Sequence, residues 1–415
     1  MTTENVHRTI ETVWRIEQPR LIAGLARIVR DVGIAEELAQ DALVVALKQW
    51  PEQGVPRNPG AWLMATGRNR AIDLLRRNKR LGRKLEEIGH DIETDAPPDP
   101  DEALDDHVGD DLLRLIFTSC HPILSSEARV ALTLRLLGGL TTDEIARAFL
   151  VPEPTVAQRI VRAKRTLSEA RVPFEVPRGE EMAKRLSSVL EVVYLIFNEG
   201  YAATAGEDWI RPQLSQEALR LGRILAQLAP NEPEVHGLVA LMEIQASRFA
   251  ARVGPKGEPV LLADQDRSRW NHLLIRRGLA ALQRAESLSD ALGPYVVQAA
   301  IAACHARARK AEDTDWARIA ALYAALGEIM PSPIVELNRA VAVSMAYGPA
   351  AGLELVEGLR EEPSLVPYHL LPTVRGDFLE KLGRKDEARA EFEKAAALTR
   401  NGRERDILLA RAAAL

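Results

Sequence analysis

The sequence predicts an all-α protein of two or three domains, and three observations support this class. Hydrophobic residues make up 47% of the 415 residues and charged residues 27%, as in an ordinary globular protein. Aromatic residues contribute only 5%, while segments rich in Ala, Leu, Arg and Glu dominate, and these residues favour helices. Stretches in which Val, Ile and Thr alternate with polar residues are few, so strands have little support.

Neither the cysteines nor the hydrophobic segments indicate secretion or a membrane. Cys120 and Cys304 are the only cysteines, which makes a disulfide framework implausible and favours a reducing cytoplasm. The first residues lack the basic and then apolar pattern of a signal peptide. No run of about 18 uncharged apolar residues occurs, so we expect a cytoplasmic protein without a membrane span.

The first domain is predicted over residues 1–85 as several helices. The segment 34–50 places Leu38, Ala42 and Ala46 on one helical face. Its other flank carries polar side chains, namely Glu36, Glu37, Gln40 and Asp41. Proline and glycine residues between positions 51 and 59 end this helix and leave a loop.

A further helix over residues 58–77 has one apolar face and one polar, mostly basic face. At about 100° per residue, Met64, Ala71, Ile72 and Leu75 share one arc. The opposite side carries Trp62, Asn69, Asp73, Arg76 and Arg77, together with Thr66 and Arg70. Arginine neutralises phosphate and an aromatic ring stacks on an unpaired base, so this face is suited to nucleic acid. An amphipathic helix with a solvated face and a packed tryptophan is the alternative.

Charge is distributed unevenly in a chain whose net charge is −5. From Arg68 to Lys84 there are eight basic residues and one acid, Asp73. From residue 86 to residue 111 there are twelve acids and no Lys or Arg. The second stretch is also proline-rich and poor in apolar residues. The pattern predicts a basic binding surface followed by an acidic linker over residues 86–111.

Residues 112–172 are predicted to form a helix-turn-helix domain. Thr141 and Glu144 have the spacing of a capping box at the start of a short helix. Pro154 then begins a second helix, which runs to about Ala170. The outer face of this helix is polar and basic, with Thr155, Gln158, Arg159, Arg162 and Arg165. Such a pair is typical of DNA-binding proteins, with a helical hairpin whose charged face is merely solvated as the alternative.

Residues 173–415 are predicted to form a domain of helix pairs separated by short turns with proline or glycine. The segment 378–396 looks like one tetratricopeptide repeat. Gly348 and Gly383 occupy the same turn position about 35 residues apart, close to the period of ~34 residues of such repeats. Helix pairs of this kind stack on their neighbours and leave a concave surface.

In this order, the segments resemble a bacterial RNA polymerase sigma factor of the extracytoplasmic-function type over residues 9–171. The segment 35–42 resembles the helix that docks on the polymerase clamp. The segment 62–77 resembles the helix of sigma region 2 that reads the promoter −10 element. The segment 140–163 resembles the helix-turn-helix of sigma region 4, which reads the −35 element.

The resemblance implies a role for each polar face. Glu37, Gln40 and Asp41 would face the polymerase clamp, within a contact to the core enzyme that includes its clamp and flap regions. Two positions depart from the family pattern. Gly67 stands where Ala is usual and is expected to loosen its helix, and Ala157 stands where Lys is common, which removes one phosphate contact.

The same resemblance implies promoter DNA as the second partner. The −10 strand would be lined by Asn69, Asp73, Arg76 and Arg77, beside a loop at 49–59 that holds an extruded base. Trp62 would either stack on that strand or pack inside the protein. The major groove at −35 would receive Thr155, Gln158, Arg159, Arg162 and Arg165.

The C-terminal tail has a resemblance of its own. Residues 193–201 and the helix pairs beyond resemble a subgroup of these sigma factors with a tetratricopeptide-like C-terminal extension. In that subgroup the extension is thought to regulate the factor in place of a membrane-bound anti-sigma factor. Two contacts for it stay open, one with a separate protein and one with the factor's own promoter-binding domains.

Two other functions compete with a sigma factor. One is a polymerase-independent regulator that combines the helix-turn-helix with a repeat domain sensing a ligand or protein, but it would have no use for the docking helix at 35–42. The other is an enzymatic tail, for which the sequence offers no nucleotide-binding or catalytic motif. We therefore expect no enzyme, no catalytic residues and no cofactor.

Smaller polar clusters are expected to be structural. The pair Cys120 and His121 has no second Cys/His pair at ligand spacing, so no metal site is expected. Asn198 and Glu199, with the nearby tyrosines of the same segment, are compatible with a ligand cluster, although polar contacts within the fold are the favoured interpretation.

Overall fold

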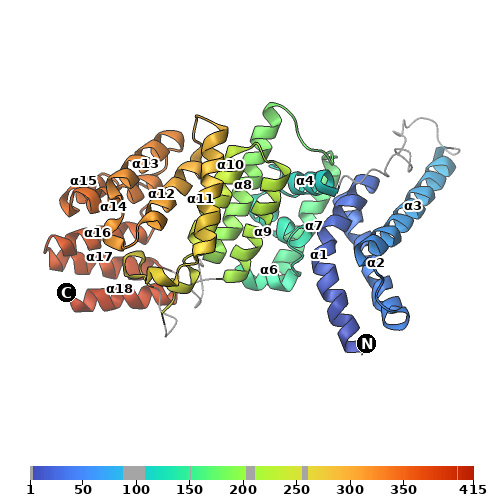
Figure 1. Cartoon of the computed structure of the whole chain (residues 1–415), viewed down its shortest axis with the longest axis horizontal. Coiled ribbons are helices and arrows are strands. Elements are labelled where there is room, and N and C mark those ends of the chain that lie inside the picture. Colours follow the sequence, from blue (N-terminus) through green and yellow to red (C-terminus); the bar gives the residue numbers. More distant parts are fainter. Residues whose placement is uncertain (1–2, 87–107, 150, 202–210, 255–259, 400) are drawn as a thin grey trace. The chain divides into compact units, whose positions relative to one another are not determined.

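The computed structural model describes residues 3–86, 108–149, 151–201, 211–254, 260–399 and 401–415. Within these ranges every regular segment is a helix, which confirms the all-α prediction (Figure 1). Among the described residues, no helix is both long enough and apolar enough to cross a membrane. Most of the acidic linker expected at 86–111 lies outside the described residues, since 87–107 are not among them.

The chain divides into two compact units, Met1–Val193 and Tyr194–Leu415. The division falls within helix α8 (Glu180–Tyr201), because hydrogen bonds attach the first part of α8 to earlier helices. The Arg185 guanidinium donates to the Phe117 carbonyl at 2.8 Å, and the Ser188 hydroxyl donates to the Cys120 carbonyl at 2.6 Å. The first unit therefore needs residues beyond 172 to complete its packing.

In its described residues, the first unit contains seven helices before α8. They are α1 (Thr3–Val29), α2 (Val32–Gln53), α3 (Pro59–Glu86), α4 (Val108–Ser119), α5 (Ser126–Leu136), α6 (Thr142–Phe149) and α7 (Glu153–Glu169). Helix α1 packs against α2, α3 and α4, and its Ile22 and Leu25 are fully buried. Asp31 caps α2 by accepting hydrogen bonds from the backbone N–H groups of Gly33 and Ile34 at 2.8 and 2.9 Å.

The helix-turn-helix forms as the sequence predicts. The backbone N–H of Thr141 donates to the Glu144 carboxylate at 2.8 Å, and the N–H of Glu144 donates to the Thr141 hydroxyl at 3.1 Å, which confirms the capping box. Helix α7 has its proline in the first turn, where a missing N–H costs nothing. Its buried face consists of Val156, Ile160, Ala163 and Leu167. Helices α5 and α6 cover that face.

The second unit is a succession of packed helices. After the end of α8 they are α9 (Pro212–Leu228), α10 (Pro233–Ala246), α11 (His272–Leu288), α12 (Pro294–Arg307), α13 (Trp316–Ile329), α14 (Pro333–Tyr347), α15 (Pro349–Glu357), α16 (Leu370–Lys381), α17 (Lys385–Leu398) and α18 (Gly402–Ala414). Where the second unit is described, four short 3-10 helices lie between them: η2 (Phe249–Ala251), η3 (Leu262–Asp264), η4 (Arg267–Arg269) and η5 (Ala311–Asp313).

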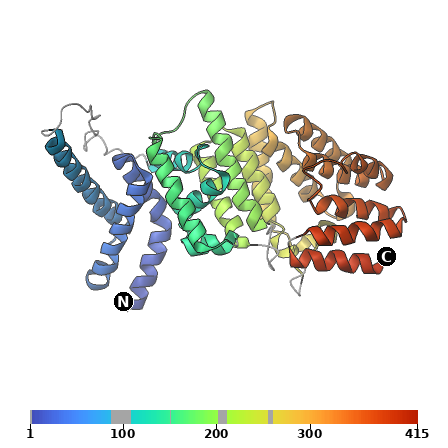
Figure 2. The same cartoon turned by 180° about the vertical axis from the view of Figure 1, so that it is seen from behind.

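Neighbouring helices in this succession lie side by side (Figures 1 and 2). Helices α16 and α17 form the hairpin that the sequence predicted, and the rings of Phe378 and Phe392 are buried within it. The predicted turn glycines, Gly348 and Gly383, have φ angles of 100° and 77°. Side chains other than glycine rarely adopt these angles, which explains glycine at both turns.

Candidate nucleic-acid interface

One polar surface lies on α2. Glu37, Gln40 and Asp41 are all exposed on this helix, so the three residues expected to meet the polymerase share an accessible face. The Asp41 carboxylate accepts a hydrogen bond from the Arg70 guanidinium of α3 at 2.6 Å. Because both side chains are largely exposed, this ion pair contributes little to stability, and Asp41 can readily change to another basic partner.

A second polar surface lies on α3. The four residues expected along the −10 strand are exposed on it: Asn69, Asp73, Arg76 and Arg77. Trp62 differs, because it is half-buried and its ring packs edge-on against Trp50, with 5.4 Å between the ring centroids. Trp50 is 2% exposed at the end of α2. This contact favours the packing interpretation of Trp62 over stacking on DNA.

The buried side of α3 is centred differently from the arc that its sequence suggested. Leu63, Gly67 and Ala71 are buried, whereas Met64 and Leu75 are only half-buried. A Cβ atom on Gly67 would lie 3.0 Å from the nearest Leu25 methyl carbon, so α1 approaches α3 most closely at this glycine. The departure from the usual alanine is therefore a packing feature, and the expectation that it only loosens the helix is incomplete.

A third polar surface is the outer side of α7. Gln158, Arg162 and Arg165 are exposed, and Thr155 and Arg159 are half-buried. All five lie away from the buried face of α7, as the sequence predicts for a helix that enters a groove. Arg165 pairs with Glu169 at 2.6 Å, but both side chains are more than half exposed, so this pair also exchanges readily.

Glu36 is a residue whose position sequence analysis missed. It was expected on the polar flank of α2, yet it is 2% exposed. Its carboxylate accepts a hydrogen bond from the Arg135 guanidinium of α5 at 2.8 Å and pairs with the Lys164 ammonium of α7. Arg135 lies 99 residues further along the chain and Lys164 lies further still, so the helical pattern around Glu36 carries no sign of them. The three residues connect α2 to the helix-turn-helix inside the first unit.

A basic cavity of about 1400 Å³ lies within the first unit. Its walls come from the ends of α1 and α7, the start of α2, part of α4 and residues 171–178. Five arginines line it, namely Arg27, Arg30, Arg114, Arg171 and Arg178. Arg27 and Arg114 both pair with the buried Asp111, at 3.2 and 2.6 Å, so part of its charge is neutralised within the protein.

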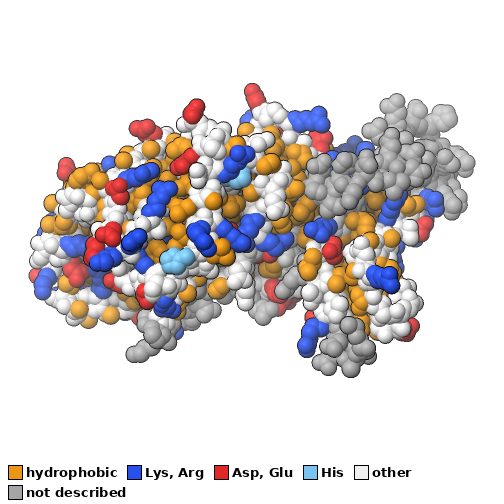
Figure 3. Space-filling model, in the orientation of Figure 1, with side chains coloured by type: hydrophobic (Ala, Val, Ile, Leu, Met, Phe, Trp, Pro, Cys, Tyr) orange, Lys and Arg blue, Asp and Glu red, His pale blue; other side chains and the backbone are white. Residues whose placement is uncertain are grey.

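Basic side chains do not form a single band on the face of the molecule drawn in Figure 3. On the face shown in Figure 3, Lys and Arg side chains are interspersed with acidic and hydrophobic ones. A protein with a net charge of −5 would have to contact nucleic acid through local basic surfaces.

The smaller polar clusters make contacts within the fold. Burial raises the pKa of the Cys120 thiol to about 11, and its sulfur lies 3.4 Å from the Thr133 hydroxyl. The His121 ring accepts a hydrogen bond from the Ile123 N–H at 3.1 Å. Glu199 forms an ion pair with Arg211. No group of three or more His, Cys, Asp or Glu suited to a metal ion occurs in the part of the chain that the structure describes.

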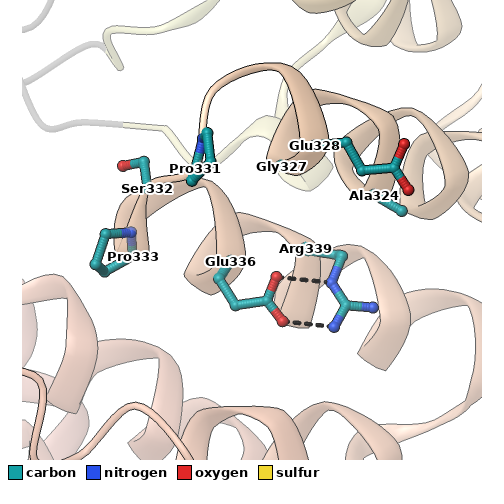
Figure 4. Close-up of a pocket in the computed structure, with 8 residues that line it drawn as sticks. All are labelled: Ala324, Gly327, Glu328, Pro331, Ser332, Pro333, Glu336 and Arg339. Atoms are coloured by element: carbon teal, nitrogen blue, oxygen red, sulfur yellow. Dashed lines mark hydrogen bonds and ion pairs between the residues drawn. The ribbon is translucent and has the colours of Figure 1, made fainter.

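A cavity of about 500 Å³ lies where α13 turns into α14 (Figure 4). Its charged lining includes Glu336 and Arg339, which form two hydrogen bonds to each other at 2.9 and 2.5 Å. These two charges offset each other, and the third charged residue of the lining is Glu328.

Comparison with known families assigns three segments of the chain. Residues 13–81 match sigma-70 region 2, and residues 114–167 match sigma-70 region 4. Residues 185–286 match a family of unknown function (DUF6596). The first two matches contain the polar surfaces of α2, α3 and α7, while the third begins in α8 and ends in α11.

Two relatives illustrate the similarity. An uncharacterized protein of Rhizobium meliloti (strain 1021) is 45% identical over 388 residues, which cover 93% of this chain and 91% of that protein. A probable ECF RNA polymerase sigma factor, SigI, of Mycobacterium tuberculosis (strain CDC 1551 / Oshkosh) is 25% identical over 170 residues. That match covers 41% of this chain and 58% of SigI. No solved structure matches the chain.

Proposed function

Because this chain belongs to the extracytoplasmic-function sigma factors of the sigma-70 family, we propose that it uses α2, α3 and α7 to recruit RNA polymerase to promoters, under control of its C-terminal unit. Members of this family are non-enzymatic initiation factors whose partners are RNA polymerase core and promoter DNA. The observation that carries the residue assignments is the exposure of all three polar surfaces on helices whose opposite faces are buried.

The polymerase contact is assigned to α2. Glu37, Gln40 and Asp41 present two carboxylates and an amide, which would set the register of docking on the clamp through charge complementarity. Region 4 would add the flap contact. Since the Asp41–Arg70 pair is exposed, its exchange for a basic clamp residue costs little.

Promoter recognition is assigned to α3 and α7. The exposed α3 face, with Asn69, Asp73, Arg76 and Arg77, would follow the single −10 strand and read an extruded base. On α7, Arg159 and Arg162 would contact base edges in the major groove at −35, where arginine can bind guanine bidentately. Trp62 would support the loop before α3 by packing on Trp50, so its role at the promoter is indirect.

Regulation is assigned to the C-terminal unit. The relative from Rhizobium meliloti covers both units at 45% identity, so the same tail accompanies the same sigma regions in a second protein. Helix α8 belongs to both compact units. A conformational change in the second unit would therefore be transmitted to region 4 through this helix. The regulatory contact is either with a separate protein or with the sigma regions themselves.

Binding of core polymerase tests the main proposal and distinguishes it from a polymerase-independent regulator. The full chain should co-purify with core polymerase, and reversing two charges by Glu37→Lys and Asp41→Lys should weaken that binding at least tenfold. Glu52→Lys, at another exposed position of α2, is the control for an added charge. If the full chain and its unit 1–193 both fail to bind core polymerase, the polymerase-independent alternative is favoured instead.

A further inference from the structure

Two arginines with an unusual backbone conformation line the basic cavity of the first unit. Among the described residues, Arg30 and Arg171 are the only residues other than glycine with a positive φ angle, at 55° and 47°. Both angles fall in the left-handed region, which side chains such as arginine rarely adopt. Both residues belong to the wall of the cavity of about 1400 Å³. The two positions with this unfavourable backbone therefore carry the same side chain on the same cavity.

Each of these arginines stands where a helix ends, a position at which glycine is usual. Arg30 follows α1, and its N–H donates to the Ala26 carbonyl at 2.8 Å. Arg171 follows the last turn of α7, where the N–H of Val172 donates to the Leu167 carbonyl at 3.1 Å. Such helix ends commonly use glycine, because it has no Cβ to clash in the left-handed conformation. A residue held in this conformation indicates that its side chain serves a function.

Stabilisation of the helix end does not account for Arg30. Basic side chains near a helix C-terminus interact favourably with its partial negative charge. Arg27 already provides such a charge in the last turn of α1, without a positive φ angle. The last turn of α7 has no basic residue, so for Arg171 this role is an alternative that the variants below decide.

The carboxylates at the cavity offset only part of its positive charge. Its five arginines stand against three carboxylates, which line the cavity or pair with its wall: Asp31, Asp111 and Glu175. Two positive charges therefore remain in excess. Within the described ranges, three of the arginines form no ion pair: Arg30, Arg171 and Arg178. All three are exposed, so a solute can reach their guanidinium groups, which match the oxygen atoms of a phosphate or carboxylate.

Much of the remaining wall is apolar. It consists of Val32, Leu113, Leu167, Val172, Pro173, Phe174 and Val176. A volume of about 1400 Å³ is far larger than an inorganic anion and is ample for an organic molecule, since such ligands occupy sites of about 300–1,000 Å³. Charged and apolar walls together suit a molecule with an anionic group and an organic body. A phosphate ester, with a charge of about −1.5 to −2 at pH 7, matches the excess of positive charge better than a single carboxylate.

From these observations, we propose that the cavity binds a small organic phosphate of about nucleotide size, with Arg30 and Arg171 as ligands of its phosphate. The apolar part of the wall would receive its organic body. Binding of this ligand does not depend on the function proposed above. The wall includes parts of α1 and α2, which match region 2, and parts of α4 and α7, which match region 4. Under the proposed function, the ligand would therefore hold the two promoter-reading regions in one compact arrangement.

Equilibrium dialysis of the full chain against ADP tests the site, at a constant ionic strength set with sodium chloride. ADP should bind saturably at one site per chain, and an excess of inorganic phosphate should displace it. Adenosine, which has the same organic body without the phosphates, should bind at least tenfold more weakly. The absence of saturable ADP binding, equal affinities for ADP and adenosine, or no displacement by phosphate would each overturn the proposal.

Glycine variants separate binding from the stability of the helix ends. Because glycine adopts positive φ angles readily, Arg30→Gly and Arg171→Gly should each unfold at the same temperature as the unchanged chain or a higher one. Each should nevertheless weaken ADP binding at least tenfold. Arg57→Gly removes an equal charge at an exposed position outside the cavity, in the loop before α3, and should leave binding unchanged.

Two results with these variants would contradict the site. Full ADP affinity in both Arg30→Gly and Arg171→Gly would show that these arginines serve only the helix ends, and would overturn the proposal. Equal losses of affinity in Arg57→Gly and Arg30→Gly would show that the binding is non-specific, and would overturn it as well.

Discussion

At the residue scale, buried charge decides which side chains the fold cannot lose. Glu36 is 2% exposed and is paired with Arg135 and Lys164. Its removal would leave both cations without this carboxylate. Each cation keeps 22% of its side-chain exposure, so Glu36→Ala should cost ~2–3 kcal/mol, below the ~3–5 kcal/mol of a fully buried pair. Denaturant unfolding of unit 1–193 measures this loss. The exposed change Glu37→Ala should alter the free energy of unfolding by no more than about 0.5 kcal/mol. An equal loss of stability in both variants would contradict the role of Glu36.

A single histidine gives the second unit a pH dependence of known sign. Burial, with Arg248 and Arg267 adding to it, lowers the pKa of His305 from 6.5 to about 4. Between these values the unfolded chain binds more protons than the folded one, so the stabilisation is complete above pH 6.5 and is lost as the pH falls toward 4. The free energy of unfolding, measured between pH 7 and pH 4, should therefore fall less steeply in His305→Phe than in the unchanged chain. His272→Phe, at an exposed position, should not alter the slope.

Direct readout is also a residue-scale prediction. Arg159→Ala and Arg162→Ala should each cost ~1–3 kcal/mol in binding to a −35 element, because each removes a contact to a base edge. Footprinting should show the loss of −35 protection, while binding to core polymerase stays unchanged. Exposed Lys184→Ala on α8 is the control. If the two arginine variants lose core binding instead, the division of roles between α2 and α7 is wrong.

At the scale of elements, the close approach of α1 and α3 depends on one glycine. Because a Cβ at Gly67 would meet Leu25 at 3.0 Å, Gly67→Val should destabilise the first unit by ~1–3 kcal/mol through overpacking. Ala65→Val places the same side chain on an exposed position of α3 and should change the stability by about 0.5 kcal/mol or less. Thermal unfolding of both variants is the measurement. A Gly67→Val protein as stable as the control would mean that α1 and α3 lie further apart.

The sequence predicts a helix, a cap or a turn correctly wherever the pattern that specifies it is local. The capping box of Thr141 and Glu144, the buried face of α7 and the turn glycines, Gly348 and Gly383, depend on residues a few positions apart, and the structure confirms them. Periodicity also placed the polar residues of α2, α3 and α7 on accessible faces, apart from the packed Trp62. It failed at Glu36 because the partners of this residue are distant in sequence.

Long-range packing limited the prediction of sites in the same way. Arg248 lies outside the turn that contains Arg267 and Trp270, and nothing local indicates that both arginines contact the Trp270 ring. Tyr201 belongs to the segment 193–201 that the sequence singles out. Its hydrogen-bond partners, Arg248 and Arg252, lie about 50 residues further along the chain, and no local pattern indicates them. The close approach at Gly67 was equally invisible, because a glycine in a helix looks unfavourable until the neighbouring helix is known.

At the scale of the whole molecule, this chain should make promoter-dependent initiation possible for core polymerase. Run-off transcription with core polymerase, a promoter template and either the full chain or unit 1–193 tests it most directly. Ending the short form at Val193 keeps the contacts of Arg185 and Ser188 that an end at Arg171 would remove. We expect a promoter-dependent transcript with at least one of the two proteins, and a different yield from the other because the proposed function gives the C-terminal unit a regulatory role. The absence of any such transcript with both proteins, each shown to be folded, would contradict it.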